Sequence, residues 1–148
     1  MKTVASILKS KDNSVVYTIE ISASIFDAVK LMGEKNIGAL IVMDRDQVVG
    51  IISERDYARK IVLMARSSKD TPLRDVMNSP VTCVRPHQTN DECMALMTEK
   101  RFRHLPVLGD DGRLIGLISI GDLVKDIICE QQFIIEQLEH YISGVQGQ

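Results

Sequence analysis

The chain has 148 residues, with 18 basic and 20 acidic side chains and a formal net charge of −2 at pH 7. Hydrophobic residues make up 45% and charged residues 26%, with a mean hydropathy of +0.01, as in soluble globular domains rather than disordered segments. This charge excludes a general attraction to nucleic acids or anionic lipids, no uncharged stretch is long enough to cross a bilayer, and the N-terminus predicts no secretory signal.

The three cysteines, Cys83, Cys93 and Cys129, are widely separated. No cysteine pair or cysteine–histidine pair has the spacing of a zinc site. We therefore expect three reduced, buried thiols that pack as small apolar side chains in a cytoplasmic protein.

The first half of the chain predicts a short helix at 4–9 and an extended stretch at 15–19, where β-branched residues are frequent. A longer helix follows, and Ser24 with Asp27 forms a capping-box pattern at its start. Its apolar residues recur at helical spacing and predict one buried face: Ile25, Ala28, Val29 and Met32.

Two apolar strands are predicted at 38–43 and 48–53, on either side of a polar turn. The second strand runs into the sequence GIISERD, whose Ser53 and Asp56 mark the start of another helix. One face of that helix is expected to be apolar: Tyr57, Ala58, Ile61, Val62 and Ala65. The polar segment 66–72 ends in proline and predicts a linker.

The second half of the chain repeats the first. The sequence LMGEK at 31–35 matches LMTEK at 96–100, and GIISERD at 50–56 matches GLISIGD at 116–122. The register shifts by one residue at the intervening turn, where insertions are tolerated. Self-similarity of this kind predicts one supersecondary unit used twice.

The second copy has its predicted elements at matching places. They are a short helix at 73–77, an extended stretch at 81–84 and a helix capped by Thr89 with Glu92. Two strands follow, at 104–108 and 114–119. We expect an α/β (α+β) fold of two pseudo-symmetric β-α-β-β-α repeats, packed through their sheets with clefts between them. The predicted divisions are 1–70, 71–129 and a C-terminal helical extension at 130–148.

The repeated Ser-x-x-Asp pattern has two interpretations. One is a helix start, where the serine hydroxyl accepts from a backbone amide and the aspartate lies at the positive end of the helix dipole. The other is a ligand site, where free amides suit a phosphate and the carboxylate accepts from ribose hydroxyls. Gly50 and Gly116 would leave room for a flat ring against the strand, or mark a bulge.

The segments IGALIVMDRDQVVGIISERD at 37–56 and RFRHLPVLGDDGRLIGLISIGD at 101–122 resemble the cystathionine-β-synthase (CBS) domain family, in the tandem arrangement called a Bateman module. The resemblance covers about 3–128. It implies a non-catalytic regulatory module that binds an adenosyl ligand between its halves: AMP, ADP, ATP, NAD or S-adenosylmethionine. It implies no other cofactor.

Carried over by position, the resemblance implies two ligand sites. The residues are Ser53, Asp56, Phe102, Arg103 and His104 at one site, and Ser119, Asp122, Ile37, Gly38 and Ala39 at the other. The aspartates are expected to hold ribose hydroxyls, the serines to touch ribose or phosphate, and the remaining residues to flank the adenine.

The two sites are expected to differ in charge and in affinity. The phosphate-side position of the second copy falls on Arg103 and His104, a basic pair assigned to the Asp122 site. For the other site Arg55 can supply the charge, whereas its counterpart in the second copy is Gly121.

Two other stretches have competing interpretations. The basic stretch 101–104 has one aromatic residue and is compatible with a nucleic-acid contact, but the acidic chain without tryptophan favours an ordinary strand. A nearby anion would favour the charged form of His104, so that residue is expected to contact phosphate. The sequence DDG at 110–112 predicts a hairpin turn rather than a metal site.

The segment 130–142 has apolar residues at helical spacing: Ile134, Leu138, Tyr141 and Ile142. It either packs back on its own module or contributes to a homodimer, as the family resemblance implies. Two other hypotheses remain: a ligand-free interaction subunit, and an enzyme acting on the bound nucleotide. Against an enzyme, no Ser/His/Asp, Cys/His or metal constellation is apparent.

Overall fold

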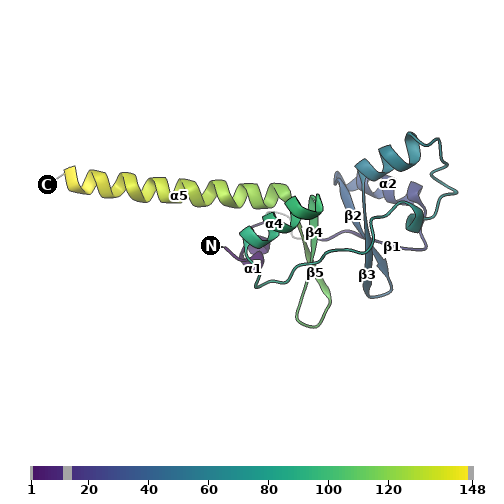
Figure 1. Ribbon diagram of the computed structural model, residues 1–148, viewed down its shortest axis with the longest axis horizontal. Helices are drawn as coiled ribbons and strands as arrows, with labels where there is room; N and C mark the ends of the chain where they lie inside the picture. Colours follow the sequence, from purple (N-terminus) through teal and green to yellow (C-terminus); the bar gives the residue numbers. More distant parts are fainter. Residues whose placement is uncertain (1, 12–14, 147–148) are drawn as a thin grey trace.

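The computed structural model describes residues 2–11 and 15–146, and its helices and strands follow the predicted order. In chain order the elements are α1 (Val4–Ser10), β1 (Thr18–Glu20), α2 (Ile25–Lys35), β2 (Ala39–Asp44), β3 (Gln47–Ser53), α3 (Glu54–Tyr57), η1 (Ala58–Val62), η2 (Leu73–Asp75), α4 (Asn90–Lys100), β4 (His104–Leu108), β5 (Leu114–Ser119) and α5 (Ile120–Gln146). Figure 1 shows two small sheets side by side, with α5 extending away from them.

Each half is built around an antiparallel hairpin. In the first half β2 pairs with β3 and, on its other edge, lies parallel to β1. In the second half β4 pairs with β5, and Val84 adds one parallel bridge to Val107 where the first copy has a short strand. The predicted extended stretch at 81–84 therefore contributes a single pair. The turn predicted at 110–112 is confirmed, with Gly112 at φ +80°.

The helix starts follow the predicted capping patterns, with one difference. Ser24 and Asp27 form both bonds of a capping box at α2. At α4 the Thr89 hydroxyl accepts from the Glu92 amide at 3.3 Å, but the Glu92 carboxylate accepts from the Gln88 side chain instead of from the backbone of Thr89. The second capping box is therefore only half formed.

The two halves exchange their opening segments. Val4 and Ile7 of α1 are 0% and 2% exposed, and they pack in the core of the second half, with α4, β4 and β5. Leu73 and Val76, which open the second repeat, are both fully buried in the core of the first half. Each core is thus completed by chain from the other repeat.

Gly50 and Gly116 leave room for side chains of the exchanged segments. The interpretation that they leave room for a flat ring is therefore wrong. A Cβ on Gly50 would lie 2.5 Å from Sδ of Met77, and one on Gly116 would lie 2.7 Å from Cδ2 of Leu8. Met77 follows η2 and Leu8 belongs to α1. The opening segments therefore occupy the space above the two strands.

The apolar face predicted after Ser53 is only partly present. The short helix α3 continues into a π-turn, η1, and Ile61 is 1% exposed. Val62, however, is 58% exposed, and Ala65 adopts a positive φ of 53° just after the helical segment. The helical segment ends at Val62, one residue after the buried Ile61, so the predicted face does not extend beyond Ile61.

The cysteines differ in burial. Cys93 is buried and Cys83 is half-buried, but Cys129 is exposed, so the expectation of three buried thiols is wrong for Cys129. Burial, with a contribution from the Glu92 carboxylate, raises the pKa of the Cys93 thiol to about 11. That thiol is therefore protonated near neutral pH.

The C-terminal helix α5 does not fold back on its own module beyond residue 130. Its 27 residues form one continuous helix, and Figure 1 shows its second half projecting from the body. Ile134 and Leu138 are 49% and 57% exposed. The packing-back interpretation is wrong. Within the described part of the chain, no helix has both the length and the apolar character needed to cross a membrane.

Candidate functional site

The first Ser-x-x-Asp pair forms a complete capping box at the start of α3. The Ser53 amide donates to Oδ2 of Asp56 at 2.9 Å, and the Asp56 amide donates to the Ser53 hydroxyl at 3.2 Å. The Ser53 hydroxyl in turn donates to the same carboxylate at 2.9 Å. The helix-start interpretation of this pattern is therefore confirmed.

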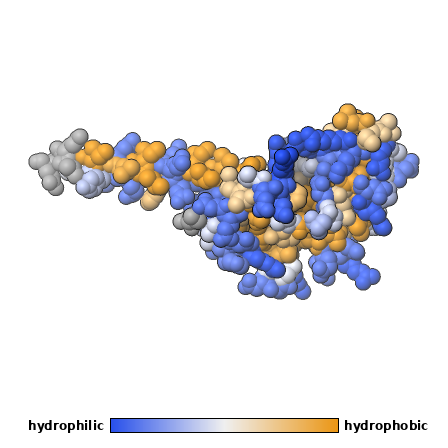
Figure 2. Space-filling model, in the orientation of Figure 1, coloured by the Kyte–Doolittle hydropathy of each residue, from blue (hydrophilic) through white to orange (hydrophobic). Residues whose placement is uncertain are grey.

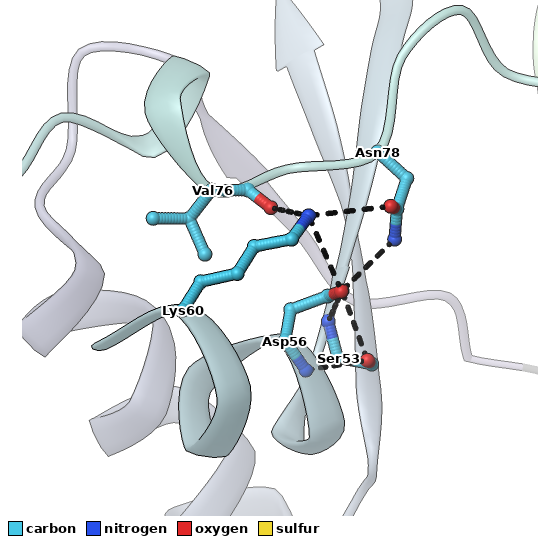
Figure 3. Close-up of polar contacts among 5 residues, drawn as sticks. All are labelled: Ser53, Asp56, Lys60, Val76 and Asn78. Carbon is cyan, nitrogen blue, oxygen red and sulfur yellow. Dashed lines mark hydrogen bonds and ion pairs between the residues drawn. The ribbon is translucent and has the colours of Figure 1, made fainter. Parts of the chain in front are cut away.

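The Asp56 carboxylate also receives groups from outside the motif (Figure 3). The side-chain amide of Asn78 donates to its two oxygens at 3.0 and 3.2 Å, and Nζ of Lys60 lies 3.6 Å from Oδ1. Lys60 also donates to the Val76 carbonyl at 2.9 Å. Because Val76 and Asn78 belong to the exchanged segment, Asp56 links the two repeats.

The second pair, Ser119 and Asp122, repeats the capping geometry with a different cation. The Ser119 amide donates to Asp122 at 2.9 Å, and the Asp122 amide donates back to the hydroxyl at 3.1 Å. Nζ of Lys11 lies 2.9 Å from Oδ2 of Asp122 and donates to the Leu117 carbonyl at 2.8 Å. Lys11 follows α1, so this carboxylate also meets the exchanged segment.

Two left-handed residues direct the predicted flanking residues toward the clefts. Asn36 ends α2 at φ 54° and Arg101 ends α4 at φ 60°. The chain turns sharply after each and enters the following strand through 37–39 or 102–104. Residue 38 also accepts a bond from the start of α3, and residue 103 accepts one from the start of α5.

The Asp56 cleft is the larger of the two and encloses about 380 Å³ between the halves. Its walls combine the motif, the turn after α4 and the segment after η2: Gly38, Ile51, Ser53, Glu54, Arg55, Asp56, Arg59, Asn78, Pro80, Val81, Thr82, Arg101, Phe102, Arg103 and His104. The residues predicted for this site are therefore gathered in one cleft.

The Asp122 cleft encloses about 210 Å³. It is lined by Leu8, Lys11, Val15, Val16, Tyr17, Ile37, Gly38, Ala39, His104, Leu117 and Ser119. Asp122 is not among these lining residues, and its carboxylate lies 2.9 Å from Nζ of Lys11. Of the basic pair assigned to this site, His104 lines both clefts, but Arg103 lines the Asp56 cleft, so its assignment to the Asp122 site is wrong.

The Asp56 cleft has a concentration of positive charge. Arg55, Arg59, Arg101 and Arg103 all line it. Among the described residues, none of these four guanidinium groups lies in an ion pair or donates a side-chain hydrogen bond. Four cations held near one another without partners favour an anion in the space between them.

His104 lies at the junction of the two clefts. Burial lowers the pKa of its imidazole, Arg103 and Lys11 lower it further, and only Asp122 opposes the shift. The neutral form is therefore favoured in the free protein, whereas the expectation from sequence was a charged phosphate contact. An anion in the cleft would shift the balance back toward the charged form.

The sequence interpretation missed Asn78, Lys11 and Lys60. Asn78 and Lys11 are far from the aspartates in sequence, and no local pattern indicates that the repeats exchange segments. Lys60 and Arg59 could have been found, because each lies four residues after a site residue, Asp56 and Arg55, on a predicted helix.

Comparison with known families agrees with this architecture. The model of the CBS domain matches twice, at residues 6–63 and 73–128. The chain belongs to the CBS domain family. The predicted α+β fold with two CBS repeats and a C-terminal helix is thereby confirmed.

Several relatives of the chain resemble it over most of its length. A CBS domain-containing protein, CBSX3, mitochondrial, from Arabidopsis thaliana is 38% identical over 96% of this chain and 72% of its own. A putative signal-transduction protein with CBS domains from Burkholderia ambifaria is 57% identical, with a TM-score of 0.82 over 88% of this chain and 96% of that one. The structure of CBSX2 in complex with AMP is 25% identical, with a TM-score of 0.71 over 88% and 99%.

Proposed function

We propose that this CBS module is a non-catalytic sensor that binds an adenine nucleotide in the Asp56 cleft and signals through its conformation or its dimer geometry. The observation that carries the proposal is the group of four arginines beside the Ser53–Asp56 pair, none of which has an ion-pair partner among the residues that the structure describes. An enclosed volume of about 380 Å³ lies within the range of small-molecule sites. The AMP complex of a related CBS protein supports the ligand class.

The chemistry of the cleft suggests how the nucleotide lies. Ribose hydroxyls would donate to Asp56 in place of the Asn78 amide, and the base would lie against the apolar groups of Ile51, Val81 and Phe102. The phosphates would then reach the arginines. Several guanidinium groups favour ADP or ATP over AMP, because each added phosphate oxygen can accept another charge-assisted hydrogen bond. They disfavour S-adenosylmethionine, which is a cation.

The Asp122 cleft is proposed to bind the same ligands more weakly. Its volume of about 210 Å³ is below the usual range for such sites. Its motif carboxylate is already engaged by Lys11 at 2.9 Å. A nucleotide would have to displace this lysine before its ribose could reach Asp122.

The exchanged segment gives the Asp56 cleft a way to report its occupancy. Asn78 contacts the Asp56 carboxylate, and two residues earlier Val76 is fully buried in the core of the first half. A ribose that displaces the Asn78 side chain would therefore remove a hydrogen bond that holds the exchanged segment, which is packed into that core through Val76. The ligand shifts the module only to the extent that it binds one arrangement better than the other.

The cellular location stays a prediction. A cytoplasmic protein was expected from the cysteines, and one relative is named as mitochondrial. The proposed mechanism works in either compartment, since it requires only an adenine nucleotide.

Thermal melts and calorimetric titrations with AMP, ADP, ATP, NAD and S-adenosylmethionine test the proposal. A ligand at 100 times its Kd adds about 2.7 kcal/mol, which raises Tm by about 5–10 °C for a chain of this size. Matched variants Asp56→Asn and Asp122→Asn separate the clefts. We expect Asp56→Asn to lose the shift and Asp122→Asn to keep most of it.

Three results would count against the proposal. If no nucleotide shifts the melt, the ligand-free interaction subunit is favoured. If only Asp122→Asn loses the shift, the assignment to the Asp56 cleft is wrong. Turnover of the bound nucleotide, measured by chromatography of the recovered ligand, would show an enzyme instead of a sensor.

A further inference from the structure

His104 provides a side chain that the two clefts share. Among the described residues, only Gly38 and His104 line both clefts, and Gly38 has no side chain. His104 begins β4 and pairs across the hairpin with Ser119, the serine of the second motif. A change of charge at this imidazole therefore acts on both clefts.

His104 has no equivalent in the first repeat. The matching position is Ala39, which begins β2 and lines the Asp122 cleft alone. Of the described histidines, the other two, His87 and His140, are exposed and line neither cleft. His104 is therefore the lining group whose ordinary pKa lies closest to neutrality.

Charges from three parts of the chain act on His104. Burial lowers the pKa of its imidazole, and Asp122 at the base of α5 opposes this shift. Lys11 after α1 and Arg103 before β4 lower the pKa further. The other charged groups that line the Asp56 cleft are three cations and two anions: Arg55, Arg59, Arg101, Glu54 and Asp56. In the free protein the neutral imidazole is favoured.

An anion in the Asp56 cleft would reverse this balance. Arg103 and His104 line the cleft next to each other, so phosphate oxygens bound to the guanidinium would neutralise a cation that disfavours the imidazolium. The same negative charge favours uptake of a proton from solvent by the imidazole. Figure 2 shows mostly hydrophilic surface on the body between α2 and the base of α5, in contrast to the hydrophobic surface along the projecting helix.

The protonated imidazole would then act on the second cleft. Nζ of Lys11 lies 2.9 Å from Oδ2 of Asp122 and donates to the Leu117 carbonyl, and a ribose must displace this lysine to reach Asp122. A cation at His104 repels the Lys11 ammonium and competes with it for the Asp122 carboxylate. Both effects lower the cost of moving Lys11 aside.

We propose that His104 couples the two clefts, so that an anion bound in the Asp56 cleft causes the imidazole to take up a proton and thereby opens the Asp122 cleft to a second ligand. The inference rests on the proposed function for the identity of the ligand, whereas the coupling itself requires only phosphate charge. Because coupling free energies are reciprocal, a ligand in the Asp122 cleft tightens binding in the Asp56 cleft by the same factor.

The coupling operates in a defined pH window. Below the pKa of His104 in the free protein the imidazole is already charged, and above its pKa in the complex it stays neutral. In neither range does nucleotide binding take up a proton at His104. Between the two values, the contribution of His104 to nucleotide affinity increases as pH falls.

NMR titration of the three histidines tests the first step. With saturating ATP, the pKa of His104 in the wild type should rise by at least about 1, which corresponds to a tenfold tighter hold on the proton. The pKa values of the exposed His87 and His140 should stay unchanged, and the variant His104→Gln assigns the signal. A pKa of His104 that does not move while ATP binds would overturn the coupling and leave the proposed function standing.

Inorganic tripolyphosphate separates the coupling from the proposed function. If ATP does not bind, the proposed function fails, and tripolyphosphate then tests the link between the arginines and His104 by itself. The same rise in the pKa of His104 is expected with this anion. An unchanged pKa with both ligands would overturn the coupling.

Calorimetric titration with ATP at pH 6.5 tests the second step. We expect the wild type to bind two nucleotides at millimolar ATP and His104→Gln to bind the second about 5- to 10-fold more weakly. The matched control His87→Gln should behave like the wild type. In a Lys11→Met background, adding His104→Gln should leave the second Kd unchanged, because the lysine on which the imidazolium acts is absent.

Three results would contradict the second step. They are a wild type that binds a single ATP, a second Kd that is equal in the wild type and His104→Gln, and a loss of second-site affinity on adding His104→Gln to Lys11→Met. The last result would show that His104 contacts the second ligand directly instead of acting through Lys11.

Discussion

The Asp56 cleft and the Asp122 cleft share one motif and differ in nearly everything around it. In both, the serine and aspartate cap a helix with the same reciprocal hydrogen bonds. The first cleft is lined by four arginines that form no ion pair within the described part of the chain, whereas Lys11 of the second cleft lies 2.9 Å from its aspartate. The duplicated motif fixes where each helix starts, and residues outside the motif decide the charge of each cleft.

The two motif carboxylates also differ in the groups that contact them. Asp56 accepts two hydrogen bonds from the Asn78 amide, with Nζ of Lys60 farther away at 3.6 Å, and a ribose hydroxyl can displace that amide at small cost because one hydrogen bond replaces another. Asp122 is met by an ammonium group that would have to be left without its carboxylate. The two clefts therefore differ both in attraction for phosphate and in the cost of admitting a ribose.

Removing two arginines gives the largest expected effect. The double variant Arg55→Ala with Arg59→Ala should weaken ATP binding about 100-fold, since each charge-assisted hydrogen bond contributes about 1.5 kcal/mol and a tenfold change corresponds to about 1.4 kcal/mol. Isothermal titration calorimetry measures this. Arg113→Ala, at an exposed turn, is the control, and an unchanged Kd in the double variant would remove the arginines from the binding site.

Removing the motif carboxylates should destabilise the two halves unequally. Asp56→Ala removes both bonds from Ser53 and leaves the half-buried Asn78 amide without its acceptor, so it is expected to cost about 2–3 kcal/mol in the free energy of unfolding. Asp122→Ala is expected to cost about 1 kcal/mol, because it removes the helix cap but, among the described residues, leaves no side-chain amide without its acceptor, and Lys11 keeps its hydrogen bond to the Leu117 carbonyl. Urea denaturation measures both, with the exposed Asp46→Ala as the reference. Equal costs would show that Asn78 adds nothing beyond the cap.

Adding a methyl group at the strand glycines tests the exchanged segments. Gly50→Ala and Gly116→Ala are each expected to lower the free energy of unfolding by about 1–2 kcal/mol, because the new Cβ meets Met77 or Leu8 well within contact distance. Gly33→Ala in α2 meets nothing within 4 Å and should be neutral or stabilising. Neutral changes at Gly50 and Gly116 in thermal melts would mean that the opening segments can withdraw from the strands.

The smallest effect concerns His104. In the folded protein the pKa of His104 is lowered by burial and by Arg103 and Lys11, and Asp122 opposes the shift. Between that lowered pKa and the ordinary value near 6.5, the unfolded chain therefore binds more protons than the folded one. Stability should therefore fall as pH drops through 6.5.

Urea denaturation of the wild type, His104→Gln and the exposed His87→Gln at pH 7.5 and 5.5 measures this loss. His104→Gln should show a smaller loss on acidification than the other two proteins. An identical pH dependence in all three would contradict the assignment to His104.

Local patterns predicted the elements well and the contacts between them poorly. The boundaries of β2 and β5 are within a residue of expectation, and Ser24 and Ser53 cap helices as predicted, because alternation and capping act over a few residues. The partners of Asp56 and Asp122 could not be predicted, because Asn78 and Lys11 reach them only through the exchange of α1 and η2. The projection of α5 could not be predicted either, since an amphipathic stripe does not reveal which surface it covers.

The exchange of opening segments also means that each hydrophobic core contains residues from both halves of the chain. Val4 and Ile7 near the start of the chain lie in the second core, and Leu73 and Val76 lie in the first. A protease that cut between residues 66 and 70 would leave two fragments, each retaining a piece of the other's interior. The nicked protein should still migrate as one particle in native gels and separate only in denaturant, because the exchanged segments hold the two fragments together without a covalent bond.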